Sequence, residues 1–329
     1  MGRSVVTIRA IAGVTLSALA WAPAAAQDWP TRPMTMVVPY AAGGSADGVG
    51  RVVAAALSQV LGQQVVVENV GGAGGMIGVQ RVAKAPPDGY QFVFGTIGTH
   101  AQSQTLYRKP LYNPATDFAP VGLITEQPTL LVARKDLPAS NLQEFIAYTK
   151  ANQGKMQYGS AGAGTGVHLA CVLLNAAIGV NVTHVPYRGG GPAMQDLIAG
   201  RLDYQCPVNT LAIPQIEGKT IRAIATLTRE RSPSLPSVAS AHEQGLADFD
   251  AAVWYALFLP KGAPAAIVQK LNGAVVAFMN DPVVRARLTE IGADPVAAER
   301  RSPDYLQRFV ESEVKRWAGP IKASGVVMD

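Results

Sequence analysis

The chain has 329 residues, of which 48% are hydrophobic and 16% charged, with a formal net charge of +5. This length suits two domains of ordinary size. The mild cationic excess suits a small anionic ligand, whereas a nucleic-acid partner would require a concentrated basic face, so we expect no nucleic-acid binding. No two of His100, His168, His184 and His242 lie within five residues of each other, so a compact zinc motif is absent and we expect no metal site.

The first 26 residues have the pattern of a secretory signal peptide. Arg3 and Arg9 precede an apolar stretch (10–22), and residues 24–26 are alanines that fit an A-x-A cleavage site. A retained membrane anchor would need about 20 apolar residues, and this stretch is shorter. We therefore expect cleavage after Ala26, a net charge of +3 once the two arginines are lost, and export to the periplasm.

Strand-like and helix-like patterns alternate in the first part of the mature chain. The expected elements are a strand over 34–38, a helix over 49–61, a strand over 65–68, a helix over 77–85 and a strand over 91–95. The loop 71–75 and the turn 86–89 contain the glycines and prolines that separate such elements. This alternation predicts a parallel sheet with helices on both faces.

The same alternation returns from about residue 128. The expected elements are strands over 129–133, 156–158, 182–187, 202–206, 221–226 and 254–259, and helices over 142–151, from about 166, and over 192–199, 265–279, 282–291 and 303–317. The sequence therefore predicts two α/β units with the same plan.

Loops rich in glycine and hydroxyl residues follow four of these strands, at 40–47, 95–99, 159–166 and 187–191. Ligands bind outside the carboxyl ends of strands in open parallel sheets. A helix that begins in such a loop offers unpaired N–H groups and the positive end of its dipole, which suit an anion. One glycine loop alone would indicate only a turn, but four of this composition favour a binding site.

Catalytic and nucleotide-binding motifs are incomplete. The nucleophile elbow G-x-S-x-G fails at Asp47, where its last glycine should stand. The dinucleotide fingerprint fails at Ile77 and at Val167, and the P-loop pattern fails at Ile213. We therefore expect a protein without enzymatic activity and without a cofactor.

At these loops the chain resembles a known family. The segments WPTRPMTMVVPYAAGGSADGVGRVVAAALSQVLGQQVVVEN, GAGG, PPDGY, YGSAGAGTGVHLA, VPYRGGGPAMQDLIAGRLD and FLPKGAP resemble the Bug (TctC-like) family, the periplasmic solute-binding proteins of tripartite tricarboxylate transporters. The resemblance implies a type II periplasmic binding fold, in which two α/β domains (27–126 with 250–329, and 127–249) close on a ligand. It also implies that the ligand is a small organic acid and that the partner is a membrane transporter.

Carried onto this sequence, the resemblance places a carboxylate against the loops 40–47 and 95–99, with the loop 159–166 completing the site. The residues expected to bind ligand are Tyr40, Gly43, Gly44, Ser45, Asp47, Thr96, Gly98, Thr99, Ser160, Ala161, Gly164, Thr165, His168, Tyr187, Arg188 and Asn209. Backbone amides, with the hydroxyls of Ser45, Thr96 and Thr99, would hold the anion without a buried cation.

Several of these residues have a structural alternative. Asp47 would repel an anion, so we expect it to cap the helix rather than to contact ligand. Arg188 suits bidentate pairing with a second carboxylate but also a solvent-facing turn. His168 fits a ligand contact or a packed core histidine, and Tyr40 and Tyr187 fit a pocket wall or the core.

Cys171 and Cys206 are the two cysteines of the chain, one on an expected helix and the other at the end of an expected strand. An oxidising periplasm would allow a disulfide between them. A free cysteine is commonly a small buried hydrophobic residue, so two unbonded cysteines in the core are the alternative.

We therefore expect a monomeric capture protein that closes on a carboxylate and presents the closed form to a transporter. Two alternatives remain open on sequence grounds. A periplasmic hydrolase would need a serine and a histidine to meet in space, for instance Ser160 with His168. A ligand sensor would use the same cleft but pass its state to a signalling receptor. Trp254 is expected to pack near the crossover between the domains.

Overall fold

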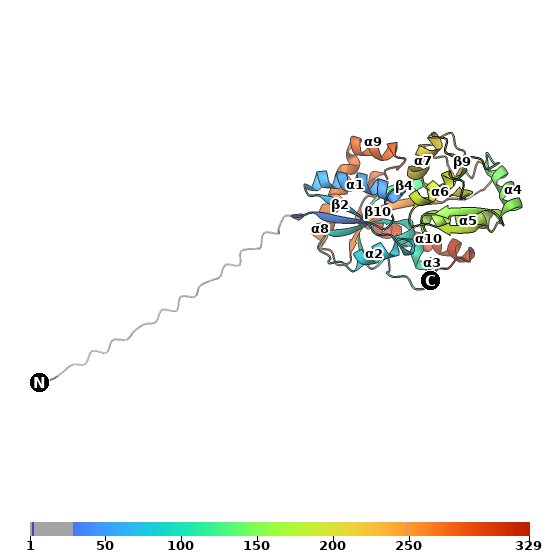
Figure 1. Ribbon diagram of the computed structural model, residues 1–329. Coiled ribbons are helices and arrows are strands. Elements are labelled where there is room, and N and C mark those ends of the chain that lie inside the picture. The colour runs from blue at the N-terminus through green and yellow to red at the C-terminus, as the bar shows by residue number, and fades with distance from the viewer. Residues whose placement is uncertain (1, 3–28, 248) are drawn as a thin grey trace.

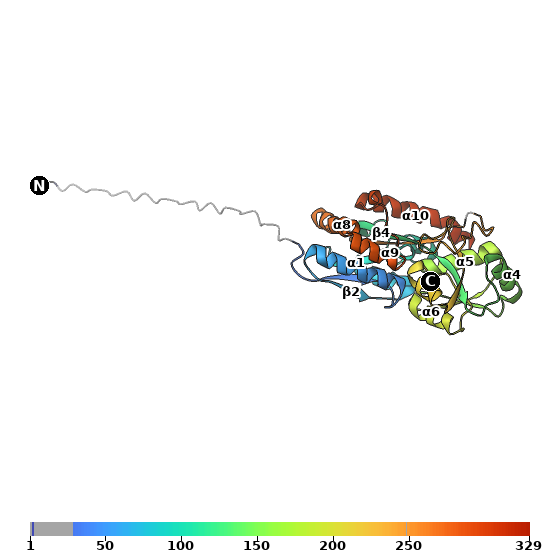
Figure 2. The same cartoon turned by 90° about the horizontal axis from the view of Figure 1, so that it is seen from above.

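The structure is a computed structural model that describes residues 2, 29–247 and 249–329. The expected signal peptide and its cleavage site after Ala26 lie outside the described residues. Two five-stranded sheets stand at opposite ends of the molecule, each with helices packed against it (Figure 1). The view from above shows the same separation, with α1 and α8 at one end and α4 and α5 at the other (Figure 2).

The first sheet has the strand order β2-β1-β3-β10-β4. Its strands are β1 (Met34–Val38), β2 (Val65–Asn69), β3 (Gln91–Thr96), β4 (Phe118–Pro128) and β10 (Ala252–Pro260). Its helices are α1 (Ser45–Leu61), α2 (Met76–Ala83), α3 (Ser103–Leu106), α8 (Ala265–Asn280), α9 (Pro282–Glu290) and α10 (Pro303–Ala323), and a π-helical turn, η2 (Gly98–Gln102), follows β3. Residues such as Met36, Phe92 and Leu257 are fully buried and form its core.

The second sheet has the order β7-β6-β8-β5-β9. Its strands are β5 (Leu130–Arg134), β6 (Gln157–Ser160), β7 (Thr183–Pro186), β8 (Tyr204–Gln205) and β9 (Ile221–Thr226). Its helices are α4 (Leu142–Asn152), α5 (Gly166–Ile178), α6 (Gly190–Ile198) and α7 (Asn209–Glu217). The fold class predicted from the sequence, two α/β domains of the periplasmic binding type, is confirmed.

The expectation of purely parallel sheets is wrong, because each sheet contains one reversed strand. β10 runs antiparallel to β3 and β4, and β5 runs antiparallel to β8 and β9. Both reversed strands directly follow a passage of the chain from one sheet to the other. β4 ends at Pro128 and β5 begins at Leu130, and β10 enters the first sheet after β9 has left the second. A strand that arrives from the neighbouring domain begins at the end of the sheet nearest that domain, where the other strands finish, and therefore runs in the opposite direction.

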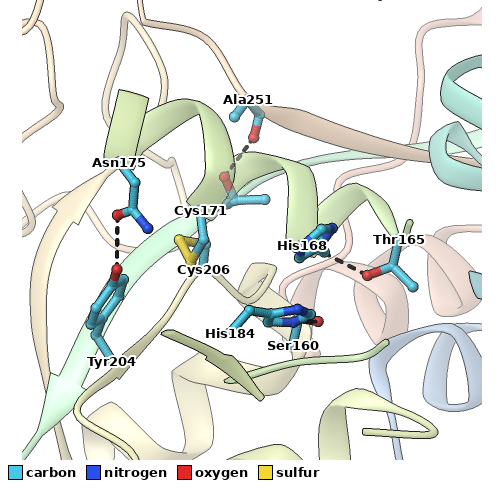
Figure 3. Close-up of a disulfide and its surroundings, with 10 residues drawn as sticks. Ser160, Thr165, His168, Cys171, Asn175, His184, Tyr204, Cys206 and Ala251 are labelled. Atoms are coloured by element: carbon cyan, nitrogen blue, oxygen red, sulfur yellow. Dashed lines mark hydrogen bonds between the residues drawn. A yellow bond between two sulfur atoms is a disulfide. The ribbon is translucent and has the colours of Figure 1, made fainter. Parts of the chain in front are cut away.

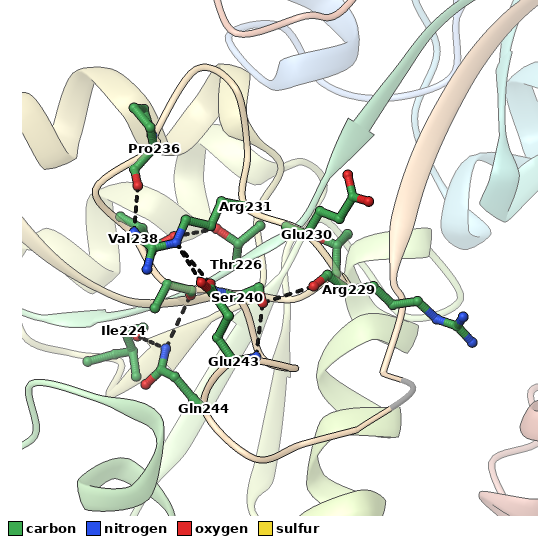
Figure 4. Close-up of polar contacts among 12 residues, drawn as sticks. Ile224, Thr226, Arg229, Glu230, Arg231, Pro236, Val238, Ser240, Glu243 and Gln244 are labelled. Atoms are coloured by element: carbon green, nitrogen blue, oxygen red, sulfur yellow. Dashed lines mark hydrogen bonds and ion pairs between the residues drawn. The ribbon is translucent and has the colours of Figure 1, made fainter.

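The segment between β9 and β10 is held by side-chain contacts to its own backbone (Figure 4). Ser240 and Glu243 bond each other's N–H groups, at 2.7 and 3.1 Å, and Arg231 Nε donates to Glu243 Oε2 at 2.9 Å. The bond from Arg231 lowers the pKa of Glu243 to about 2. Gln244 Nε2 donates to Ile224 O at 3.0 Å, which ties this segment back to β9.

Trp254 lies on β10 just after this passage and is 1% exposed. Its Nε1 and that of Trp317 both donate to Glu313 Oε2, at 3.0 and 3.1 Å. Because Glu313 and Trp317 belong to α10, these bonds fasten the last helix to the strand that returns from the second sheet.

Candidate functional site

A cavity of about 50 Å³ lies between the two sheets. Its wall from the first sheet includes Tyr40 after β1 and Thr96 at the end of β3, and its wall from the second includes Ser160 at the end of β6. The complete lining is Tyr40, Gly44, Ser45, Ala46, Thr96, Ser160, Ala161, Thr165, Gly166, Val167, Gly190, Gln205, Pro207, Val208, Leu211, Val253 and Tyr255. Among the residues that the structure describes, no charged side chain lines this cavity.

Four helices begin at the cavity wall, α1, α5, α6 and α7, and the N-cap of α7, Val208, is part of the lining. α1 starts after Gly44 and α6 after Gly189, and neither of these glycines can cap the helix with a side chain. α5 is capped by Thr165, whose Oγ1 accepts from the N–H of His168 at 3.2 Å. The first N–H groups of a helix have no partner within it and lie at the positive end of its dipole. The cavity therefore offers hydrogen-bond donors and positive potential without a cationic side chain, which suits a carboxylate.

The rims of the cavity meet through backbone atoms and through one pair of hydroxyl groups. The Ala41 N–H donates to Arg188 O at 3.1 Å, and Ser45 Oγ lies 2.7 Å from Thr210 Oγ1. A Cβ atom added to Gly191 would lie 2.9 Å from Gly43 O, closer than real Cβ contacts allow. Glycine at this position lets the loops of the two domains touch, so the structure is a closed form.

Two further close approaches join the two domains. A Cβ on Gly98 would lie 2.9 Å from the N–H nitrogen of Gly166, and one on Gly74 would lie 2.7 Å from Ala163 O. Gly74 also has a φ of 63°, in the left-handed region that favours glycine. Along the cleft, glycines therefore allow backbone-to-backbone contact between the domains.

Hydroxyl groups on the first wall form a connected network. Tyr40 Oη lies 2.9 Å from Thr96 Oγ1, and burial raises the pKa of Tyr40, so its hydroxyl stays protonated. Thr99 is fully buried behind the wall, where its Oγ1 accepts from the N–H of Thr96 at 3.0 Å. Gly98 and Thr99 thus shape the turn that presents Thr96, while Thr96 itself faces the cavity.

Asp47 bonds the turn that starts α1 rather than lining the cavity. Its Oδ2 accepts from the N–H of Gly43 and from Arg51 Nε, both at 3.0 Å, and its Oδ1 accepts from Asn69 Nδ2 at 3.0 Å. Burial acts to raise the pKa of Asp47, but these hydrogen bonds outweigh it and hold the pKa below its ordinary value. The carboxylate of Asp47 is therefore paired outside the cavity, although Asp47 lies only two residues beyond Ser45.

Ser160 joins the cavity to a pair of neighbouring histidines (Figure 3). Its Oγ lies 2.7 Å from His184 Nε2 and also accepts from the N–H of Gly162 at 3.1 Å. The rings of His168 and His184 are 4.1 Å apart, and the ring of Tyr158 stacks on His184 at 4.8 Å. The structure therefore pairs Ser160 with His184, not with the His168 considered from the sequence.

Both histidines are neutral at physiological pH. Burial, together with the neighbouring His184, lowers the pKa of His168 to about 3, and burial lowers that of His184 to about 4. His168 Nδ1 accepts from the N–H of Gly164 at 3.2 Å, so this ring supports the loop before α5 from behind.

The remaining sequence-predicted residues lie outside the cavity lining. Gly43 lines a groove between α1, α7 and α9, together with Asp47. Tyr187 and Arg188 line a separate depression of about 380 Å³ beside the loop 72–75. Asn209 is fully buried at the start of α7, where its Nδ2 donates to Ser232 Oγ at 2.7 Å.

Sequence reasoning missed Gln205, Leu211, Val253 and Tyr255, which line the cavity. Gln205 ends β8 and is 3% exposed, and its Nε2 has no hydrogen-bond partner. The rule that ligands bind at the carboxyl ends of strands applies to β8 as well. The sequence after β8, Cys-Pro-Val, has no glycine or hydroxyl residue, so it did not match the pattern that selected the other loops.

The residue after Gln205 is bonded to α5. Cys206 and Cys171 form a disulfide with a Cα–Cα distance of 5.5 Å, and both residues are at least 99% buried (Figure 3). The end of β8 is thereby fixed to the helix whose first turn lines the cavity.

Within residues 29–247 and 249–329, no helix combines the length and apolar character that a membrane span requires. Over the same residues, His, Cys, Asp and Glu do not gather in a group of three or more that could hold a metal ion.

This protein has two α/β domains that enclose an uncharged cavity where several helices begin. This arrangement places it in the class of solute-binding proteins. The chain belongs to the tripartite tricarboxylate transporter family of receptors, whose family model matches residues 49–326. This is the Bug (TctC-like) family of periplasmic binding proteins, as the resemblance of the loops predicted.

Three solved structures illustrate the relationship. The periplasmic binding protein BugD is 38% identical, with a TM-score of 0.88 over 92% of this chain and 100% of its own. MatC of Rhodopseudomonas palustris, solved with bound malate, is 40% identical, with a TM-score of 0.87 over 89% of this chain and 100% of its own. The R. palustris protein Rpa4515, solved with adipate, is 38% identical, with a TM-score of 0.87 over 91% and 99%.

Proposed function

We propose that this protein captures a small organic acid by its carboxylate in the cavity between the domains and delivers it to a tripartite tricarboxylate-type membrane transporter. The observation that carries the proposal is the meeting of four helix starts at a buried, uncharged cavity. Malate in MatC and adipate in Rpa4515 support an acid as the ligand, and the family supports the transporter partner. The protein would act in the periplasm after cleavage near Ala26.

The carboxylate would lie against the first wall, where the start of α1 and the Thr96 hydroxyl face the cavity. Ser160, Ala161 and Thr165 would close on it from the second wall when the domains 27–126 with 250–329 and 127–249 come together. Four of the other sequence-predicted residues would act from behind: Gly98 and Thr99 through the turn before Thr96, and Gly164 and His168 through the loop before α5.

Thermal unfolding tests this proposal. Residues 27–329, unfolded and refolded to remove bound ligand, are heated with a panel of carboxylic acids and with the amides and esters of the same acids. A ligand that binds only the folded state raises the apparent stability, by about 2.7 kcal/mol at one hundred times its Kd. We expect stabilisation by one or more acids and none when that acid has no free carboxylate. Absence of stabilisation by every acid would contradict the proposal.

A variant locates the site. Ser160→Ala removes a hydroxyl from the cavity wall, and we expect the affinity for the stabilising acid to fall about tenfold. Ser312→Ala, on the exposed face of α10, removes a hydroxyl that bonds only Phe309 O and serves as the matched control. Equal affinity in Ser160→Ala and Ser312→Ala would place the ligand elsewhere.

One contact favours a second candidate function, a periplasmic hydrolase. Ser160 and His184 lie within hydrogen-bond distance, as a nucleophile and its base would. The ring contacts of His184 are to Tyr158 and His168, and among the described residues no carboxylate bonds it. A pKa of about 4 also makes His184 a weak general base at neutral pH. Ester turnover by the refolded protein, abolished in Ser160→Ala, would favour the hydrolase.

A further inference from the structure

Ser45 lies where the cavity meets the outer groove between α1, α7 and α9, and it lines both. On the cavity side it contacts Tyr255: burial raises the pKa of Tyr255 to about 12, and a hydrogen bond with Ser45 acts in the opposite direction. On the groove side, Ser45 Oγ lies 2.7 Å from Thr210 Oγ1. Thr210 lines the groove and is not part of the cavity lining, so it stands behind Ser45 as seen from the cavity.

The two hydroxyl groups belong to different domains. Ser45 is the first residue of α1, which covers the first sheet. Thr210 lies in the first turn of α7, which packs against β5 and β9 of the second sheet. A hydrogen bond of 2.7 Å between them requires the domains to be closed as they are here. The contact therefore couples one residue of the cavity wall to closure.

The number of protons in this pair limits how it can serve an anion. A serine or threonine hydroxyl donates one hydrogen bond and can accept two, whereas a carboxylate only accepts. If Ser45 donates its proton to a carboxylate in the cavity, the proton in the bond between Ser45 and Thr210 must come from Thr210. A hydroxyl that accepts one hydrogen bond also becomes a stronger donor in the next.

On the basis of the proposed carboxylate capture, we infer that Thr210 is a positioning residue for the ligand. Its hydroxyl donates to Ser45 Oγ across the cleft and thereby directs the Ser45 proton to the carboxylate. Thr210 acts through Ser45 and does not touch the ligand. Because the same bond joins the domains, the ligand and the closed form stabilise each other at this point.

A double-mutant cycle tests this inference. Isothermal titration calorimetry on refolded residues 27–329 measures the affinity for the acid that stabilises the protein most in the thermal panel, in which malate and adipate are included. We expect Ser45→Ala to lower the affinity about thirtyfold, because it loses a bond to a charged acceptor as well as the bond between the domains. Thr210→Val loses only a bond between neutral groups and should lower the affinity about fivefold. The double variant should bind no more weakly than Ser45→Ala alone.

The other patterns of the cycle contradict the inference. Equal decreases in all three variants would mean that Ser45 donates to Thr210, so that the pair joins the domains without serving the ligand. A decrease in the double variant equal to the product of the single decreases would mean that the two residues act independently. Full affinity in Thr210→Val would remove Thr210 from binding altogether.

Matched variants separate the hydroxyl from the fold. Thr210→Ser keeps the donor and should bind within about twofold of the unchanged protein, whereas a decrease as large as that of Thr210→Val would overturn the inference. Thr289→Val, on the exposed surface of α9, is the control for the loss of a threonine hydroxyl and should bind as the unchanged protein does. Thr210→Ala takes the place of Thr210→Val should that variant not fold. Failure of every acid to bind would overturn carboxylate capture itself, whereas a bound acid with the wrong cycle overturns the role of Thr210 alone.

Discussion

His184 shows at the residue scale how burial couples the site to pH. Its ring lies between Ser160 on the cavity wall and the stacked rings of Tyr158 and His168. Burial lowers the pKa of both histidines well below the ordinary value near 6.5. The unfolded chain therefore binds more protons than the folded one between pH 6.5 and about 4. The free energy of unfolding must decrease as the pH is lowered through that range.

This coupling predicts a lower melting temperature at mildly acidic pH. The contribution of the two histidines is fully present above pH 6.5 and is lost as the pH falls toward about 4. We expect the melting temperature to fall by about 5 °C between pH 7 and pH 5, where most carboxylates stay ionised. His184→Gln keeps an acceptor for Ser160 without a titrating ring, and its decrease should be clearly smaller. An equal decrease in the variant would exclude His184 as the cause.

At the scale of elements, the disulfide fixes the strand end that presents Gln205. Cys206 follows Gln205 directly, and Cys171 lies on α5, whose first turn also lines the cavity. β8 has just two residues, Tyr204 and Gln205, so its own ladder holds it weakly. The covalent bond therefore joins two separate parts of the cavity wall.

Loss of this bond is expected to destabilise the protein. The cysteines are 35 residues apart, and a loop of that length implies a stabilisation of about 4 kcal/mol through the unfolded state. We expect Cys171→Ala/Cys206→Ala to lower the urea midpoint by a corresponding amount. The unchanged protein, unfolded with a reductant present, should show a similar decrease. A midpoint unchanged in both experiments would mean that the bond contributes nothing to stability.

The elements also show what sequence patterns can predict. The strand, loop and helix over 34–61 were predicted because alternating hydrophobicity and the glycine turn are local signals. β4 and α7 were missed, since Pro120 and Pro128 interrupt the first and Pro214 the second. Thr96 and Ser160 at the cavity follow the strand-end rule. Gln205 depends on the order of strands in the second sheet, with β8 between β6 and β5, which no local pattern contains.

At the scale of the whole molecule, closure depends on the absence of side chains at the rim. Gly191 lies in the first turn of α6, where a Cβ would approach Gly43 O to 2.9 Å. Alanine is favoured over glycine in a helix by about 1 kcal/mol, so a substitution here does not threaten the helix itself. It opposes the contact between the domains instead.

Gly191→Ala is therefore expected to separate closure from folding. We expect the ligand-free melting temperature to be unchanged or slightly raised, and the affinity for the captured acid to fall about tenfold because overpacking costs 1 to 3 kcal/mol. Gly273→Ala, in α8 with no heavy atom within 4 Å of the added Cβ, is the matched control. Calorimetry gives the affinity, and small-angle scattering gives the compaction on binding. Full affinity and compaction in Gly191→Ala would contradict the closed form described here.

Main-chain atoms join the two rims of the cavity, and this affects how the cavity lining can vary among related proteins. The hydrogen bond from the Ala41 N–H to Arg188 O uses main-chain atoms alone, and Gly191 leaves room for Gly43 O beside it. The cavity lining behind them can change its chemistry without altering how the rim meets. The outer shape of the closed protein can then stay the same while the lining that selects a ligand changes.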